Sequence, residues 1–305
     1  MSFTIALTTV AVMLCYTIPG YLLVKSKLVP RTSIAAFATV LMYLNSPFQT
    51  LYAMQRIELS GYVLRYLGLT FVLGLILMGA MLALVYGITR RRQDQVPYRI
   101  CTTAAVFGNC GFMGIPLLEA LMPHYPQAVA FSAAFFLAQC VMMWTVGSFV
   151  ITRDPKYMSL RKVFLNPSTL AMCVSLVLLF ARVRFTGQVA DFIALLSRMA
   201  TPMCMLILGM RLGVIPLRPL FTRPLQYLAI ALKLLAFPLL VLAVTRFLPV
   251  EPDYARTLYV MACCPVGNVV LSFSEMLGEG QDVAANVVLL STFLSVLTIP
   301  VMLLI

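Results

Sequence analysis

Two short segments of the chain carry asparagine, glycine and proline inside otherwise apolar sequence. Residues 108–116 read GNCGFMGIP, and residues 265–268 read PVGN. Proline removes a backbone N–H and glycine accepts non-helical dihedral angles, so a helix is expected to unwind at both segments. The helix that restarts after each break has free N–H groups and the positive end of its dipole, and an asparagine there adds an amide donor. These groups together are suited to binding a carboxylate.

The predicted substrate-binding residues are the amides, glycines and prolines of the two segments, together with one arginine. They are Gly108, Asn109, Gly111, Pro116, Pro265, Gly267, Asn268 and Arg198. The asparagines could cap the restarting helices or donate directly to the substrate. Arg198 could attract an anion or extend to the membrane interface, and the glycines and prolines could simply kink the two helices.

Lys233 lies near the middle of an apolar run, where no aspartate or glutamate is available to pair with it. A buried ammonium in this position loses its proton, coordinates carbonyl groups, or takes the place of a coupling cation beside the unwound segments. The alternative is a lysine whose long side chain reaches the membrane interface. Lys233 is therefore predicted to be a coupling or structural cation.

The chain lacks the residue patterns of enzymes and metal sites. His124 is the only histidine and lies between prolines in a turn, so neither a zinc motif nor a Ser-His-Asp triad can be built. The eight cysteines fall in apolar runs without C-x-x-C spacing, and no ATP-binding loop occurs. We therefore expect no enzymatic activity, no cofactor and no metal, and any work on a solute must draw on a gradient.

The composition excludes a water-soluble protein. Of the 305 residues, 62% are apolar and 10% are charged, against roughly 45–50% and 25% in soluble domains. The net charge of +12 could suggest nucleic acid, but in a membrane protein it marks cytoplasmic loops. The lipid bilayer, and not nucleic acid, is therefore the expected environment.

Apolar windows predict ten transmembrane helices in one membrane domain. They cover residues 3–24, 33–54, 62–88, 98–122, 127–151, 166–184, 189–213, 222–248, 254–278 and 281–304. With the N-terminus outside, most loop lysines and arginines fall on the cytoplasmic side, as the positive-inside rule requires. An even number of spans returns the C-terminus to the outside as well.

The two halves of the chain resemble each other at an offset of about 155 residues. Pro47 in the second expected helix matches Pro202 in the seventh, and both are predicted helix breaks. Glu119 and Glu275 likewise end the fourth and ninth helices. Five helices per repeat is an odd number, so the second copy must enter from the opposite face. The predicted fold is an all-α polytopic membrane protein with inverted repeats at 1–155 and 156–305, in which broken helices 4 and 9 cross.

The segment 108–118 resembles the auxin efflux carrier family, as do Gly20-Tyr21-Leu22-Leu23, Thr201-Pro202 and residues 265–268. That family includes plant auxin exporters and bacterial malonate and malate permeases. The resemblance covers the whole chain, and the short connection between the fifth and sixth helices is similar to the bacterial branch. It implies a bacterial inner-membrane protein, a homodimer, a scaffold of helices 1, 2, 6 and 7, and a moving bundle of the other six. It also implies that Asn109, Pro116, Pro265 and Asn268 hold the substrate carboxylate, whereas Lys233 matches no family motif.

These features predict a secondary active transporter that moves a small organic carboxylate by elevator-type alternating access, with proton or sodium coupling. One alternative is a sodium-coupled organic-anion symporter of the bile-acid type, although sodium sites need midplane carboxylates that this sequence lacks. A channel and a non-transporting membrane sensor are further alternatives.

Overall fold

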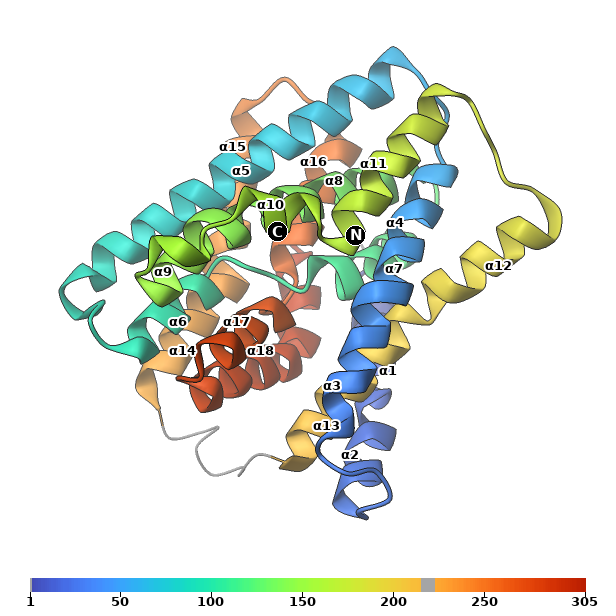
Figure 1. Ribbon diagram of the computed structural model, residues 1–305. Helices are drawn as coiled ribbons and strands as arrows, with labels where there is room; N and C mark the ends of the chain where they lie inside the picture. The colour runs from blue at the N-terminus through green and yellow to red at the C-terminus, as the bar shows by residue number, and fades with distance from the viewer. Residues whose placement is uncertain (1, 215–222) are drawn as a thin grey trace.

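The structure is a computed structural model that describes residues 2–214 and 223–305, and its regular elements there are helices (Figure 1). The α-helices are α1 (Phe3–Cys15), α2 (Thr17–Lys25), α3 (Ser33–Val40), α4 (Ser46–Gln55), α5 (Gly61–Thr89), α6 (Val96–Ala104), α7 (Ile115–Leu121), α8 (Gln127–Met142), α9 (Ser148–Thr152), α10 (Leu160–Phe164), α11 (Pro167–Phe180), α12 (Gly187–Arg198), α13 (Ala200–Val214), α14 (Pro224–Ala231), α15 (Phe237–Phe247), α16 (Pro252–Cys263), α17 (Asn268–Leu277) and α18 (Gln281–Met302). Two 3-10 turns are η2 (Arg90–Arg92) and η5 (Pro155–Tyr157).

Seven helices of the described ranges are long and apolar enough to cross a membrane. They cover Phe3–Lys25, Gly61–Arg92, Gln127–Thr152, Pro155–Phe180, Gly187–Val214, Pro224–Phe247 and Gln281–Met302. These match seven of the ten expected ranges, although residue 222, the first of the range 222–248, lies outside the described residues. The all-helical membrane fold is therefore confirmed, whereas the number ten and the inverted arrangement stay predictions.

The other three expected ranges contain interrupted helices. Residues 33–55 form α3 and α4 with a π-helical segment between them, and Pro47 lies in the first turn of α4. The expected helices 98–122 and 254–278 are each divided in two, at the predicted breaks. An interruption also occurs within Gly187–Val214, one of the seven long helices, where Pro202 lies in the first turn of α13 after α12 has ended at Arg198. Both predicted helix-breaking prolines thus lie where the helix geometry changes.

Four short π-helical segments occur in the described chain, and none was predicted. They are η1 (Leu41–Asn45), η3 (Cys110–Gly114), η4 (Met143–Gly147) and η7 (Leu232–Ala236). A π turn inserts one residue into the helical period and redirects the side chains that follow it, which is why such turns concentrate at functional sites.

The helices pack in two groups (Figure 1). In the first group, α2 packs on α13, and α4 packs on α11 and α12. In the second group, α8 packs on α5, α7 and α16, α16 packs on α15, and α18 packs on α14 and α17. Helix α1 lies between the groups and contacts both α13 and α18.

The contact between α2 and α13 depends on glycine. A Cβ added to Gly209 would overlap the carbonyl oxygen of Thr17, and one added to Gly20 would overlap the carbonyl oxygen of Leu206. Small residues of this kind let membrane helices approach closely, where van der Waals packing replaces the missing hydrophobic driving force.

We expect Gly209→Ala to destabilise the protein, because the added methyl group must push α2 away from α13, at a cost of about 1–3 kcal/mol. The matched control is Gly68→Ala in α5, where nothing lies within 4 Å of the added Cβ. That variant should gain about 0.5–1 kcal/mol from helix propensity. Thermal unfolding of the detergent-solubilised protein checks both, and equal melting temperatures for the two variants would contradict the prediction.

Candidate functional site

The two unwound segments cross and pair with each other through their backbones. The N–H of Asn109 donates to the carbonyl oxygen of Pro265 at 2.7 Å, and the N–H of Gly267 donates to that of Phe107 at 3.0 Å. Gly108 and Val266 therefore form an isolated antiparallel bridge. Gly267 permits this approach, since an added Cβ would lie 2.7 Å from the Gly108 carbonyl oxygen. The pairing supplies partners to backbone groups that lipid cannot satisfy.

Side chains from two neighbouring helices also form hydrogen bonds with the backbone of the two paired segments, hereafter the crossing. The Gln139 amide on α8 accepts from the N–H of Gly108 and donates to its carbonyl oxygen, both at 2.9 Å. The Ser291 hydroxyl on α18 accepts from the N–H of Val266 at 3.1 Å. Both polar side chains are buried, so the crossing is anchored to α8 and α18.

A cavity of about 280 Å³, hereafter the asparagine cavity, lies against the crossing. Five of the predicted site residues line it: Gly108, Asn109, Gly111, Gly267 and Asn268. Three of the π-helical segments, η1, η3 and η4, also contribute lining residues. Much of the wall is apolar, and Arg211 is the one charged residue among the described residues that line it. A small apolar pocket with a few converging polar groups is typical of a small-molecule site.

The two asparagines converge on one residue of α13. The Nδ2 atoms of Asn109 and Asn268 lie 3.8 and 3.5 Å from the Sγ atom of Cys204. Asn268 is the first residue of α17, and its buried Oδ1 atom has no hydrogen-bond partner among the described residues. Because a thiol is a weak acceptor, the amide donors are available to a stronger one.

Lys233 lies on the crossing but does not line the asparagine cavity. Its ammonium group is fully buried and donates to the carbonyl oxygen of Ala262, in the last turn of α16, at 2.8 Å. It also lies 4.6 Å from the centroid of the Phe237 ring. Gly108 packs against it, since an added Cβ would lie 3.1 Å from the Nζ atom. The positive charge therefore meets the negative end of the α16 dipole.

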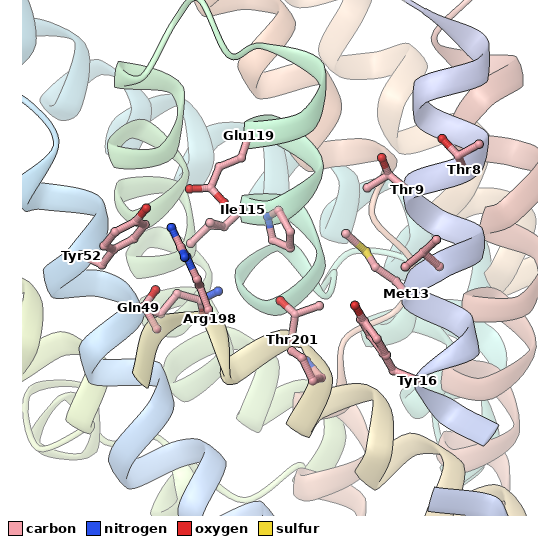
Figure 2. A pocket seen from close by; sticks show the side chains of 14 residues that line it. Thr8, Thr9, Met13, Tyr16, Gln49, Tyr52, Ile115, Glu119, Arg198 and Thr201 are labelled. Atoms are coloured by element: carbon pink, nitrogen blue, oxygen red, sulfur yellow. The ribbon is translucent and has the colours of Figure 1, made fainter. Parts of the chain in front are cut away.

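Pro116 and Arg198 line a different cavity of about 410 Å³, hereafter the Arg198 cavity (Figure 2). The Glu119 side chain also lines it and pairs with Arg56. Figure 2 shows the side chains of Arg198 and Glu119 extending toward each other from α12 and α7. The structure thus separates two predicted site residues from the asparagines.

A hydrogen bond connects residues that line the two cavities. The Thr201 hydroxyl, which lines the Arg198 cavity, donates to the carbonyl oxygen of Phe112 at 2.6 Å, and Phe112 lines the asparagine cavity. Pro265 lines neither of these cavities, and its carbonyl group is used within the crossing.

Sequence reasoning missed three residues of the site. Gln139 and Cys204 lie in apolar runs, and only their contacts reveal them. Arg211 lies in no motif and is one of the basic residues that the positive-inside rule assigns to the cytoplasmic side. A signal for it existed in the repeat, because Arg56 and Arg211 are 211 − 56 = 155 positions apart, and their partners Glu119 and Glu275 are 275 − 119 = 156 positions apart.

Comparison with known proteins agrees with a membrane transporter. The model of a family described as "Membrane transport protein" matches residues 5–159 and 151–303. The chain is also 24% identical over 297 residues to a protein of Rhizobium meliloti (strain 1021) described as "Putative malonate transporter". That alignment covers 92% of this chain and 89% of the relative.

We expect Gln139→Leu to destabilise the crossing, because the N–H and carbonyl groups of Gly108 would both lose their side-chain partner in a buried position. Each unsatisfied group costs about 1–3 kcal/mol. The matched control is Gln226→Leu, since both amide atoms of Gln226 are buried without a partner in the described chain. Melting temperatures in detergent check the pair, and a Gln139→Leu variant as stable as the control would contradict the expectation.

Proposed function

The chain belongs to the membrane transport protein family, and from that premise we propose that it is a secondary active transporter of a small organic carboxylate. The observation that carries the proposal is the convergence of Asn109 and Asn268 on the asparagine cavity. A carboxylate there would replace the Cys204 thiol as acceptor, and charge-assisted hydrogen bonds are roughly twice as strong as neutral ones. The N-terminus of α17, which begins at Asn268, adds a favourable dipole.

The description of the Rhizobium meliloti relative makes malonate the first substrate to test. Malonate is small enough for a cavity of about 280 Å³. A larger aromatic acid would have to place its ring against the apolar wall of the same cavity.

The proposed mechanism is elevator-type alternating access in ten helices arranged as two inverted repeats, residues 1–155 and 156–305. The first packing group would be the scaffold and the second the moving bundle. Two ion pairs that join the groups support this division. Arg56 after α4 pairs with Glu119 of α7, and Arg211 of α13 pairs with Glu275 of α17. A moving bundle would have to break these contacts in turn.

The proposal extends to the setting of the transporter. A homodimer in the bacterial inner membrane, with both termini outside, accords with the charge distribution of the loops and with the family resemblance.

Lys233 is proposed as a tethered cation that stands where a transporter of the bile-acid type would use a coupling ion. Its bond to Ala262 places a fixed positive charge at a helix end within the crossing. A charge in this geometry stabilises a helix C-terminus by up to about 2 kcal/mol. A sodium ion would then not be needed beside the crossing.

We expect Asn109→Ala and Asn268→Ala each to raise the KM for malonate by about 10-fold to 100-fold, because each removes a hydrogen bond to a charged group worth about 1.5–3 kcal/mol. Uptake of labelled malonate into proteoliposomes, with counterflow, checks this. Asn286→Ala is the control, since Asn286 is buried in α18 outside both cavities. Unchanged KM values in both asparagine variants would refute the site. Flux without saturation or counterflow would indicate a channel, and no flux would indicate a sensor.

We expect Lys233→Met to lower the transport rate at least about 10-fold, because the crossing loses the charge that stabilises the end of α16. Wild-type uptake should persist when sodium is replaced by choline. A sodium requirement in the wild type would instead favour the bile-acid-type symporter. If the variant keeps both the rate and the pH dependence of the wild type, Lys233 is reduced to a packing residue.

A further inference from the structure

The wall of the asparagine cavity formed by α13 is a single stripe of side chains. Ile207 and Arg211 line the cavity, and Cys204 accepts from both asparagines. Positions 204, 207 and 211 follow the i, i+3, i+7 spacing of one helix face. Arg211 therefore lies two turns, or about 10 Å, along α13 from the asparagine pair. In the structure the guanidinium is held by Glu275, which lies two turns along α17 from Asn268. Once released from Glu275, it can reach back toward the asparagines, because helical side chains lean toward the N-terminus of their helix.

The hydrogen bonding of Arg211 is incomplete. Its Nη1 and Nη2 atoms both donate to the Glu275 carboxylate of α17, the second at 3.4 Å. Its Nε atom is buried and has no partner among the described residues. The Arg211 side chain is 14% exposed, whereas that of Glu275 is 43% exposed. The glutamate is thus the more exposed partner of the pair.

The repeat-related pair at Arg56 and Glu119 has the opposite arrangement. There the glutamate lines the neighbouring cavity and Arg56 does not. Of these two repeat-related arginines, Arg211 lines the asparagine cavity and Arg56 lines neither cavity. Arg56 is therefore a natural control for effects that come only from breaking an ion pair between the two packing groups.

We propose that Arg211 is a further substrate-binding residue and that Glu275 is its internal competitor. When substrate enters, one of its carboxylate groups takes the place of Glu275 on the guanidinium, while another acceptor group meets the asparagines. The planar guanidinium of arginine presents a fork of N–H donors. The carboxylate of Glu275 and a carboxylate of the substrate can each accept hydrogen bonds from this fork. The exchange releases α17 from α13, so binding breaks one contact between the two packing groups. This inference rests on the proposed function.

The exchange predicts opposite effects for the two partners. In proteoliposomes, Arg211→Gln should raise the KM for labelled malonate about 10-fold or more, because substrate loses a charged partner. Glu275→Gln should lower that KM at least about 3-fold, because the competitor is weakened. The KM for acetate, which has a single carboxylate, should change much less in Arg211→Gln. Arg211→Lys, which keeps the charge without the fork, should be intermediate.

Arg56→Gln and Glu119→Gln are the matched controls, and they should change the KM for malonate and for acetate in equal proportion. The inference is overturned if Arg211→Gln and Glu275→Gln shift the KM for malonate in the same direction, since a purely structural ion pair behaves that way. It is also overturned if Arg211→Gln leaves the KM for malonate unchanged. Should Arg211→Gln fail to fold, Glu275→Gln and Arg211→Lys still decide the question.

The asparagine variants separate this failure from that of the proposed function. If Asn109→Ala and Asn268→Ala impair malonate uptake but Arg211→Gln does not, only the exchange is wrong. If the wild type transports neither malonate nor acetate, or the asparagine variants have no effect, the carboxylate site itself is wrong.

Discussion

The need to satisfy every backbone polar group inside a membrane governs this site. Two helices unwind, and the N–H and carbonyl groups that they release would each cost several kcal/mol in lipid. The two unwound segments use each other for part of this bonding, and Gln139, Ser291 and Lys233 supply further hydrogen bonds. Gly267 and Gly108 are small because the opposing backbone and the lysine occupy the space where a side chain would be.

This bonding pattern also determines which groups remain for a ligand. The backbone of the crossing is largely committed, whereas Asn109 and Asn268 donate only to a thiol, and Arg211 keeps a buried Nε without a partner. The three residues that carry these weakly used donors all line one cavity. The hydrogen-bonded backbone of the crossing is thus rigid, while a few side-chain donors remain able to bind a ligand. A binding site requires this combination.

The sequence was sufficient for the parts of the site that depend on backbone chemistry. The breaks at residues 108–116 and 265–268 follow from proline and glycine, and the depth of Lys233 follows from its place in an apolar run. Helix rotation could not be predicted, because apolar residues surround most spans and leave no clear stripe. This is why Arg198 and Pro116 were grouped with the asparagines but line another cavity, and why Gln139 was missed. The π-helical segments depend on tertiary packing and left no local signal.

A tethered cation and a bound cation have different thermodynamic consequences. A coupling ion must bind and dissociate in each cycle, and its gradient can therefore drive the substrate uphill. The ammonium of Lys233 is covalently attached, so it cannot leave with the substrate as a sodium ion does, and it can couple transport to a gradient only by releasing and regaining its proton. If it fills the position of a coupling ion, the driving force for uphill transport must come from protons, carried by Lys233 or by another group, or from the membrane potential acting on the anion. The net charge moved per substrate then distinguishes these sources, because the potential contributes about 2.3 kcal/mol per charge and 100 mV.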